Sequence, residues 1–116
     1  MLNLNTLVMS AIKTALYTYV NDRIYFMYPP DFNNLPVISY FCIDNIETIH
    51  SDNNEIGSGI SYQIDVWSVS STTDIYNVIH DAMILRDFEE ITSCDKYDTV
   101  NQTYNKSIEF WIDYPI

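Results

Sequence analysis

The chain has 116 residues, of which 47% are hydrophobic and 18% are charged, a composition that suits one folded domain and excludes a disordered chain. Its formal net charge is −11, and its five basic residues are spread along the sequence without a cluster. Binding to phosphate backbones and to anionic membranes depends on clustered lysine and arginine, so we expect neither specific DNA binding nor membrane attachment.

The first segment predicts an amphipathic helix. Apolar residues recur at three- and four-residue intervals from Leu4 to Tyr19, which places them in one stripe, and Asn3 or Asn5 can cap its start. Polar residues interrupt the segment, so it lacks the unbroken apolar run of a membrane span and the basic start of a signal peptide. We therefore expect a chain that is not secreted, and its two cysteines, at positions 42 and 94, should be reduced and buried thiols.

Two short strands are expected next, at residues 23–28 and 37–43. A turn-rich loop that begins at Pro29-Pro30 separates them, because proline cannot donate to a strand ladder. The run 37–43 is almost continuously apolar, which indicates burial on both faces. Residues 47–59 are polar and contain both glycines, and this composition predicts a flexible loop.

Residues 60–67 alternate apolar and polar side chains, the period of a strand with one buried face. A second helix should begin near Ser71, which can cap it, with Asp74 in its first turn and Arg86 in its last.

Two further strands, at residues 89–96 and 103–114, complete the order helix, three strands, helix, two strands. Each helix has a single apolar stripe, and both stripes are buried if the helices lie on the same face of the sheet. The sequence therefore predicts one two-layer α+β domain over residues 1–116, with a mainly antiparallel sheet of about five strands and two helices on one face.

Candidate catalytic and metal-binding residues occur without the partners that such chemistry needs. His50 and His80 are the histidines available as bases, and no nucleophile motif accompanies either of them. The two cysteines match no zinc spacing. The acidic segment that starts at Asp52 has Ile56 where a calcium loop needs an oxygen ligand, and Gln63 where it needs a bidentate glutamate. We therefore predict no catalytic residues, no metal and no cofactor.

The outward face of the strand 60–67 is the candidate interaction surface. Asp65 and Trp67 lie on that face, opposite the apolar positions, and Trp111 takes the corresponding position in the last strand. Large aromatic residues on the outer face of a sheet often mark a partner surface. The alternative is that another segment, such as the loop 29–36, covers these aromatic residues.

Several segments together, in their order and spacing, carry a resemblance to a known family. The most specific is the strand SYQIDVWS at residues 61–68, which is followed by a capped helix. The other segments are Arg23–Tyr25, Leu35–Tyr40, Met83 with Asp87-Phe88, Tyr97–Thr99, and Tyr104–Lys106 with Phe110. The chain resembles, over nearly its whole length, the tail-completion or tail-terminator proteins of long-tailed bacteriophages of the siphophage type that infect Gram-positive hosts. It departs from that family at Asn105-Lys106, where His-Lys is expected, and within residues 47–59.

The resemblance implies a structural virion protein that forms a hexameric ring on the head-proximal end of the tail tube. There it would stop tube polymerisation and join the tail to the head connector. Its implied partners are further copies of itself, the major tail tube protein and the head completion or connector protein, and DNA would pass through the ring without specific binding. The implied location is the tail–head junction of the virion, or the bacterial cytoplasm during assembly from a phage or prophage. The state of the free subunit is left open, and a monomer is one possibility.

The segment 47–59 is the second candidate interaction site. We expect it to be flexible in the free subunit and to become ordered against the tube or the connector, as segments that order on binding do. Its candidate contact residues are His50, Asp52, Asn53, Asn54 and Glu55.

A function of another class is also consistent with the sequence. The net charge of −11 on so small a chain suits an acidic DNA mimic that inhibits a nuclease or a repressor. Such a mimic binds a basic target with steep salt dependence, whereas a tail terminator binds tube ends with little of it.

Overall fold

The computed structural model describes residues 4–51 and 54–115, and the side-chain surroundings of residues 4–43 and 59–113. Helix α1 (Asn5–Val20) follows from the apolar stripe of the first segment, because Val8, Ile12 and Leu16 point to the same side and are fully buried. The helix starts without a side-chain cap. Asn5 instead accepts a hydrogen bond from the hydroxyl of Tyr62, so its side chain joins α1 to the sheet. In the part of the chain that the structure describes, neither helix has the length and apolar character of a membrane span.

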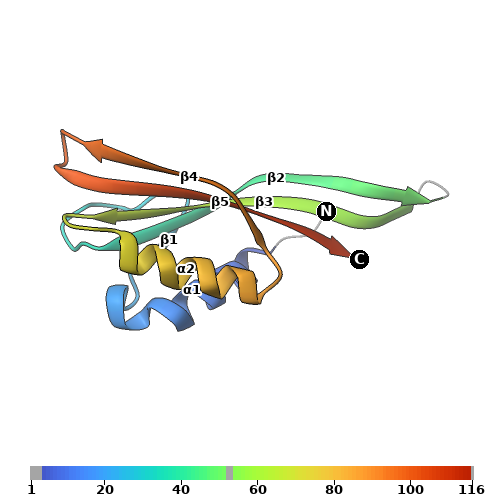
Figure 1. Cartoon of the computed structure of the whole chain (residues 1–116), viewed down its shortest axis with the longest axis horizontal. Coiled ribbons are helices and arrows are strands. Elements are labelled where there is room, and N and C mark those ends of the chain that lie inside the picture. Colours follow the sequence, from blue (N-terminus) through green and yellow to red (C-terminus); the bar gives the residue numbers. More distant parts are fainter. Residues whose placement is uncertain (1–3, 52–53, 116) are drawn as a thin grey trace.

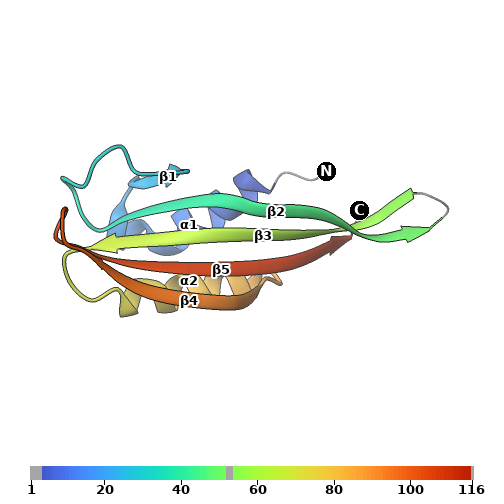
Figure 2. The same cartoon turned by 90° about the horizontal axis from the view of Figure 1, so that it is seen from above.

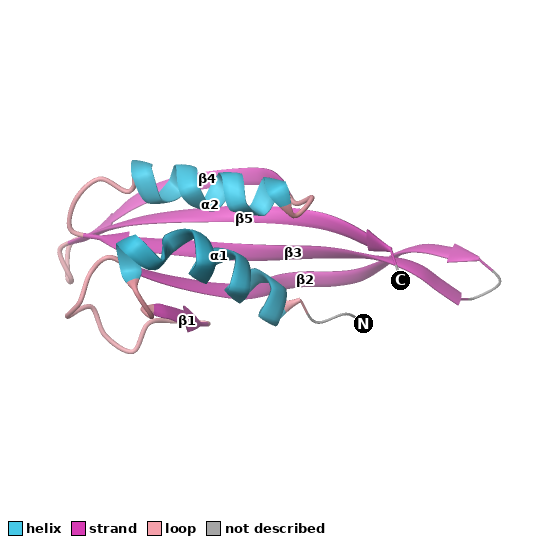
Figure 3. Ribbon diagram, turned by 90° about the horizontal axis from the view of Figure 1, so that it is seen from below, coloured by secondary structure: helices cyan, strands magenta, loops and turns pink. Residues whose placement is uncertain are grey.

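Five strands form one sheet, in the order β1-β2-β3-β5-β4. The short strand β1 runs parallel to β2, and every other neighbouring pair is antiparallel. Both helices pack on the same face of this sheet, as Figures 1 and 3 show, and the opposite face carries no helix. The predicted fold class and element order are therefore confirmed. The strands are β1 (Ile24–Phe26), β2 (Val37–Ser51), β3 (Asn54–Ser68), β4 (Glu89–Asp98) and β5 (Thr103–Pro115).

The core lies between the helices and the central strands. Strand β3 supplies the alternating residues that the sequence pattern predicted to point inward, and all four are buried: Ile60, Tyr62, Ile64 and Val66. The ring of Tyr62 is 1% exposed and packs edge-on against Phe88, at 6.5 Å between ring centroids. Burial of this side chain raises the pKa of its hydroxyl to about 12.

Helix α2 (Thr73–Leu85) begins two residues after Ser71, whose hydroxyl oxygen accepts the backbone N–H of Thr73 at 3.2 Å. Asp74 lies in the first turn, where the positive end of the helix dipole favours it. At the other end, the guanidinium of Arg86 donates to the carbonyl oxygen of Ala82 at 3.2 Å, which supplies a partner for one of the last carbonyl groups of the helix.

Residues 47–59 are not the loop that their composition predicts. Residues 47–51 belong to β2 and residues 54–59 to β3, and the ladder between the two strands continues to the pair Ser51 and Asn54. The expectation failed because both strands are paired along this stretch, and β5 adds a second ladder to β3 as far as Gly57. Backbone pairing on this scale overrides the weak strand propensity of glycine and asparagine. Figure 1 shows the resulting hairpin extending beyond both helices.

The cysteines are exposed, which corrects the expectation that they are buried. Residues 37–40 are buried on both faces of the sheet, as predicted. Cys42 and Ile43 are exposed because they lie beyond the part of β2 that pairs with β1. Cys94 is exposed because β4 is the last strand of the sheet and eight of its ten residues are exposed.

Candidate interaction surface

The helix-free face of the sheet carries the three outward residues that the sequence analysis selected, and the structure gives each a different environment. Trp67 is half-buried, and the rings of Tyr28 and Phe32 pack against it at centroid distances of 5.6 and 5.0 Å. Its indole N–H donates to the hydroxyl of Ser39 at 3.2 Å. The segment that follows β1 therefore covers Trp67, as the alternative interpretation proposed for the loop 29–36.

Asp65 is buried in spite of its outward position, with 6% of its surface exposed. Its carboxylate accepts hydrogen bonds from the side-chain amide of Gln63, at 3.1 and 3.2 Å, and from the hydroxyl of Ser107. The bond from Ser107 links β5 to β3, so this carboxylate stabilises the sheet and offers little surface to a partner.

Trp111 is half-buried and lies between Ser61 of β3 and Glu89 of β4 in the register of the sheet. Asn105 lies six residues before Trp111 on β5, at the position where the sequence resemblance led us to expect histidine. Its side-chain amide is buried and donates to the carbonyl oxygen of Val66 at 3.2 Å. The asparagine thus joins β5 to β3.

The candidate residues of the hairpin cannot be placed as side chains. His50, Asn54 and Glu55 belong to the paired backbone of β2 and β3, and their side chains lie outside the described residues. Asp52 and Asn53 lie outside the described residues entirely. The proposed ordering of this segment on a partner therefore remains a prediction, although its backbone already forms strands on both sides of residues 52–53.

A polar cluster beneath β4 and β5 holds the second histidine. Glu90 accepts the hydroxyl of Tyr76 at 2.7 Å and lies 3.1 Å from Nδ1 of His80. The hydrogen bond to Glu90, with a smaller contribution from burial, raises the pKa of Tyr76. Lys106 lies 4.5 Å from the centre of the same tyrosine ring and 3.3 Å from the carboxylate of Asp95. The cluster joins α2 to the hairpin of β4 and β5.

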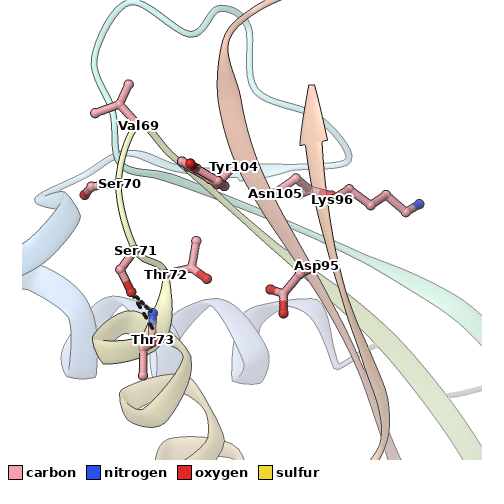
Figure 4. Close-up of a pocket in the computed structure, with 9 residues that line it drawn as sticks. All are labelled: Val69, Ser70, Ser71, Thr72, Thr73, Asp95, Lys96, Tyr104 and Asn105. Atoms are coloured by element: carbon pink, nitrogen blue, oxygen red, sulfur yellow. Dashed lines mark hydrogen bonds between the residues drawn. The ribbon is translucent and has the colours of Figure 1, made fainter. Parts of the chain in front are cut away.

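A pocket of about 440 Å³ lies between the segment before α2 and the hairpin of β4 and β5 (Figure 4). Hydroxyl groups from Ser71 and its neighbours line one side, and Ser71 already binds the backbone of Thr73. Asp95 is paired with Lys106, and Lys96 extends away from the serines. Among residues 4–51 and 54–115, no group of three histidine, cysteine, aspartate or glutamate residues is placed to hold a metal ion.

Exposed apolar side chains lie at the two opposite edges of the sheet, at positions that the sequence pattern did not indicate. They gather near the end of β1, along β4 and at the turn after it, and their exposure depends on strand order, which no local sequence pattern reveals. The only local signal is the absence of apolar alternation in β4, whose sequence is EEITSCDKYD. The residues are Phe26, Met27, Tyr28, Ile91, Tyr97, Val100 and Tyr104.

Comparison with known proteins adds one structural likeness. No protein-family model matches the sequence, and no curated protein matches it either. Among solved structures, the fold is similar to a chain in the virion of a native gene transfer agent particle, with a TM-score of 0.59 and 10% sequence identity. The similarity covers 93% of this chain and 94% of that chain. The two chains therefore share their fold over nearly their full lengths.

Proposed function

We propose that this chain is a structural protein of a phage-like virion, and that it closes the head-proximal end of the tail tube. In this role several copies form a ring that ends tube polymerisation and joins the tail to the head connector, without catalysis. The observation that carries the proposal is the full-length fold similarity to a virion chain, combined with the sequence resemblance to tail terminators.

The charge of the chain agrees with this role. A net charge of −11 repels the phosphates of DNA, so a ring of such subunits lets a genome slide through and does not retain it. The buried carboxylate of Asp65 shows that part of this charge serves the sheet itself, and the exposed acidic residues of β4 remain available to the surface.

Tail length measured by electron microscopy tests the proposal. Purified chain is added to polymerising tail tube protein, together with a matched reaction that contains heat-denatured chain. Short tubes of uniform length, with the chain at one end, are expected. Tubes that grow equally long in both reactions would refute the proposed function.

If the chain is instead an acidic DNA mimic, a binding experiment with the same purified chain should give a different result. If the chain instead binds a basic protein such as a nuclease, and this binding falls steeply as salt increases, the mimic is favoured.

A further inference from the structure

The sheet has two open edges, one on each side. Strand β4 is the last strand and pairs with β5 alone, so the outer backbone groups of its ten residues have no strand beside them in the described structure. On the opposite side, β1 accompanies β2 only at Ile38–Tyr40. The pairing with β1 ends at Tyr40, the fourth residue of β2. The remaining eleven residues of β2, 41–51, have no strand on that side among the described residues. Figure 2 shows β1 beside the first part of β2, and β4 at the other side of the sheet.

We propose that these two edges join neighbouring copies of this chain, with β4 of one subunit adding to residues 41–51 of β2 in the next. This inference rests on the proposed function, in which several copies form a ring, and it assigns the contacts between those copies to the two edges. An open edge presents unpaired N–H and C=O groups, and addition of a strand satisfies them. The contact is heterologous because it uses two different edges, which is the kind of interface that closes into a ring.

The dimensions of the two edges match. One edge has ten residues and the other has eleven. The backbone of β2 is irregular between Cys42 and Asp44 and again between Glu47 and His50, so a ladder would form in segments between these points. The register irregularity of β4 lies between Glu90 and Thr92, and from Thr92 to Asp98 the pairing with β5 is regular. At least seven consecutive residues of β4 therefore have the regular backbone that a new ladder requires.

Apolar side chains accompany both edges. On β4, Ile91 is 52% exposed and Tyr97 is 49% exposed. On the other side, Ile43 is exposed on β2, and Phe26 and Met27 are exposed where β1 ends. A strand added to residues 41–51 lies in line with β1, so its end meets Phe26 and Met27. The contact buries apolar groups from both subunits, which supplies the free energy that backbone pairing alone lacks.

A pairing of β4 with β4 is the competing arrangement, and charge argues against it. The strand carries Glu89, Glu90, Asp95 and Asp98 against one lysine, Lys96. Two such strands would place the acidic residues of both ends near each other, whereas residues 41–51 carry two acidic residues, Asp44 and Glu47. The pairing of unlike edges therefore has the smaller repulsion.

The two cysteines provide the test, because one lies on each edge and both are exposed. If the edges align over their full length, in either strand direction, Cys94 lies about four residues from the position opposite Cys42, or about 13 Å along the strand. A flexible bis-maleimide with a longer arm can join the two sulfur atoms. Full-length chain is cross-linked at high concentration and high salt, alongside the variants Cys42→Ser and Cys94→Ser.

The proposal predicts a ladder of products beyond the dimer for the natural chain. Each single variant should lose all of these products, the dimer included, because the joined pair of Cys42 and Cys94 then lacks one member. Peptide mapping should find Cys42 joined to Cys94. Products that stop at a dimer joined through two copies of Cys94 would overturn the proposal in favour of β4 paired with β4. A complete absence of cross-links in the natural chain, or a dimer that persists in Cys42→Ser or Cys94→Ser, would also overturn it.

The cross-linking result and the tube-length result are separable. A chain that limits tube length but gives no ladder refutes the paired edges and leaves the proposed function standing. A chain that gives the ladder but leaves tubes long refutes the function at the tube end and leaves the paired edges standing.

Discussion

At the scale of single residues, polar groups at buried positions have partners that fix the packing of the layers. Tyr62 is the clearest example, since its ring belongs to the core and its hydroxyl donates to Asn5 of α1. Asp65 and Asn105 do the same on the opposite face, where each joins two strands. These residues hold the sheet and the helices in register.

Tyr62 gives a pH prediction. Its pKa is raised from 10.0 to about 12 in the folded state, so its contribution to stability is fully present below pH 10 and is lost as the pH rises toward 12. Tyr62→Phe should cost about 0.5–1.5 kcal/mol near neutral pH, because one hydrogen bond is lost. The difference in unfolding free energy between the two proteins should then be smaller at alkaline pH than at neutral pH. Urea denaturation of both proteins at neutral and at alkaline pH measures this difference.

The matched control for this prediction is Tyr17→Phe, since Tyr17 is exposed on α1. It should leave the unfolding free energy nearly unchanged at neutral pH. An equal loss of stability for Tyr62→Phe at neutral and alkaline pH would contradict the predicted linkage.

The covering of Trp67 gives a second prediction at this scale. Phe32→Ala removes the ring that lies 5.0 Å from the indole, so Trp67 should become more exposed and its fluorescence should shift to longer wavelength. The measurement is made in a Trp111→Phe background, so that one indole reports. Tyr97→Ala removes a ring that pairs with Tyr104 and makes no ring contact with Trp67, so it should leave the emission unchanged. An unshifted spectrum for Phe32→Ala would show that the loop does not shield Trp67 in solution.

At the scale of elements, the sequence predicted the helices and strands that have a regular apolar periodicity, but it did not predict which strands pair with each other. The spacing of apolar residues identified α1, and the alternation at residues 60–67 identified the inward face of β3, because both patterns are local. Residues 47–51 and 54–59 form strands because they have partners across the hairpin, whereas their own polar sequence indicated a loop. The exposure of Cys42 and Cys94 depends on strand order for the same reason. The two alternatives for Trp67 could be separated only once the segment after β1 was placed.

The open edge of β4 gives a prediction for this element. Ile91→Lys should weaken association between copies, because it places a solvated charge at an apolar contact on the edge. The control is Leu85→Lys, which introduces the same charge at an apolar residue that is 79% exposed at the end of α2 and belongs to neither edge strand. Sedimentation velocity measures both variants. Equal behaviour of the two would argue against a contact along β4.

At the scale of the whole molecule, association has to overcome the repulsion between chains that each carry a net charge of −11. Salt screens this repulsion, since the Debye length falls from about 10 Å at 0.1 M to about 3 Å at 1 M. We therefore predict that the average oligomer size, measured by light scattering, increases between these two salt concentrations. Dissociation as salt increases would indicate that attraction between opposite charges holds the copies together, in conflict with the apolar and backbone contacts proposed here.

Strand β3 has a mechanical consequence through its position in the sheet. From Gly57 to Ser68 it is hydrogen-bonded to β5 on one side, and β2 accompanies nearly all of this length on the other side. A force applied parallel to the strands would load both ladders in shear. The force would then be distributed over many hydrogen bonds at once, and they would not break one after another. A subunit built around such a strand can bear tension along its long axis, and stretching experiments on single molecules would find it stiffest in that direction.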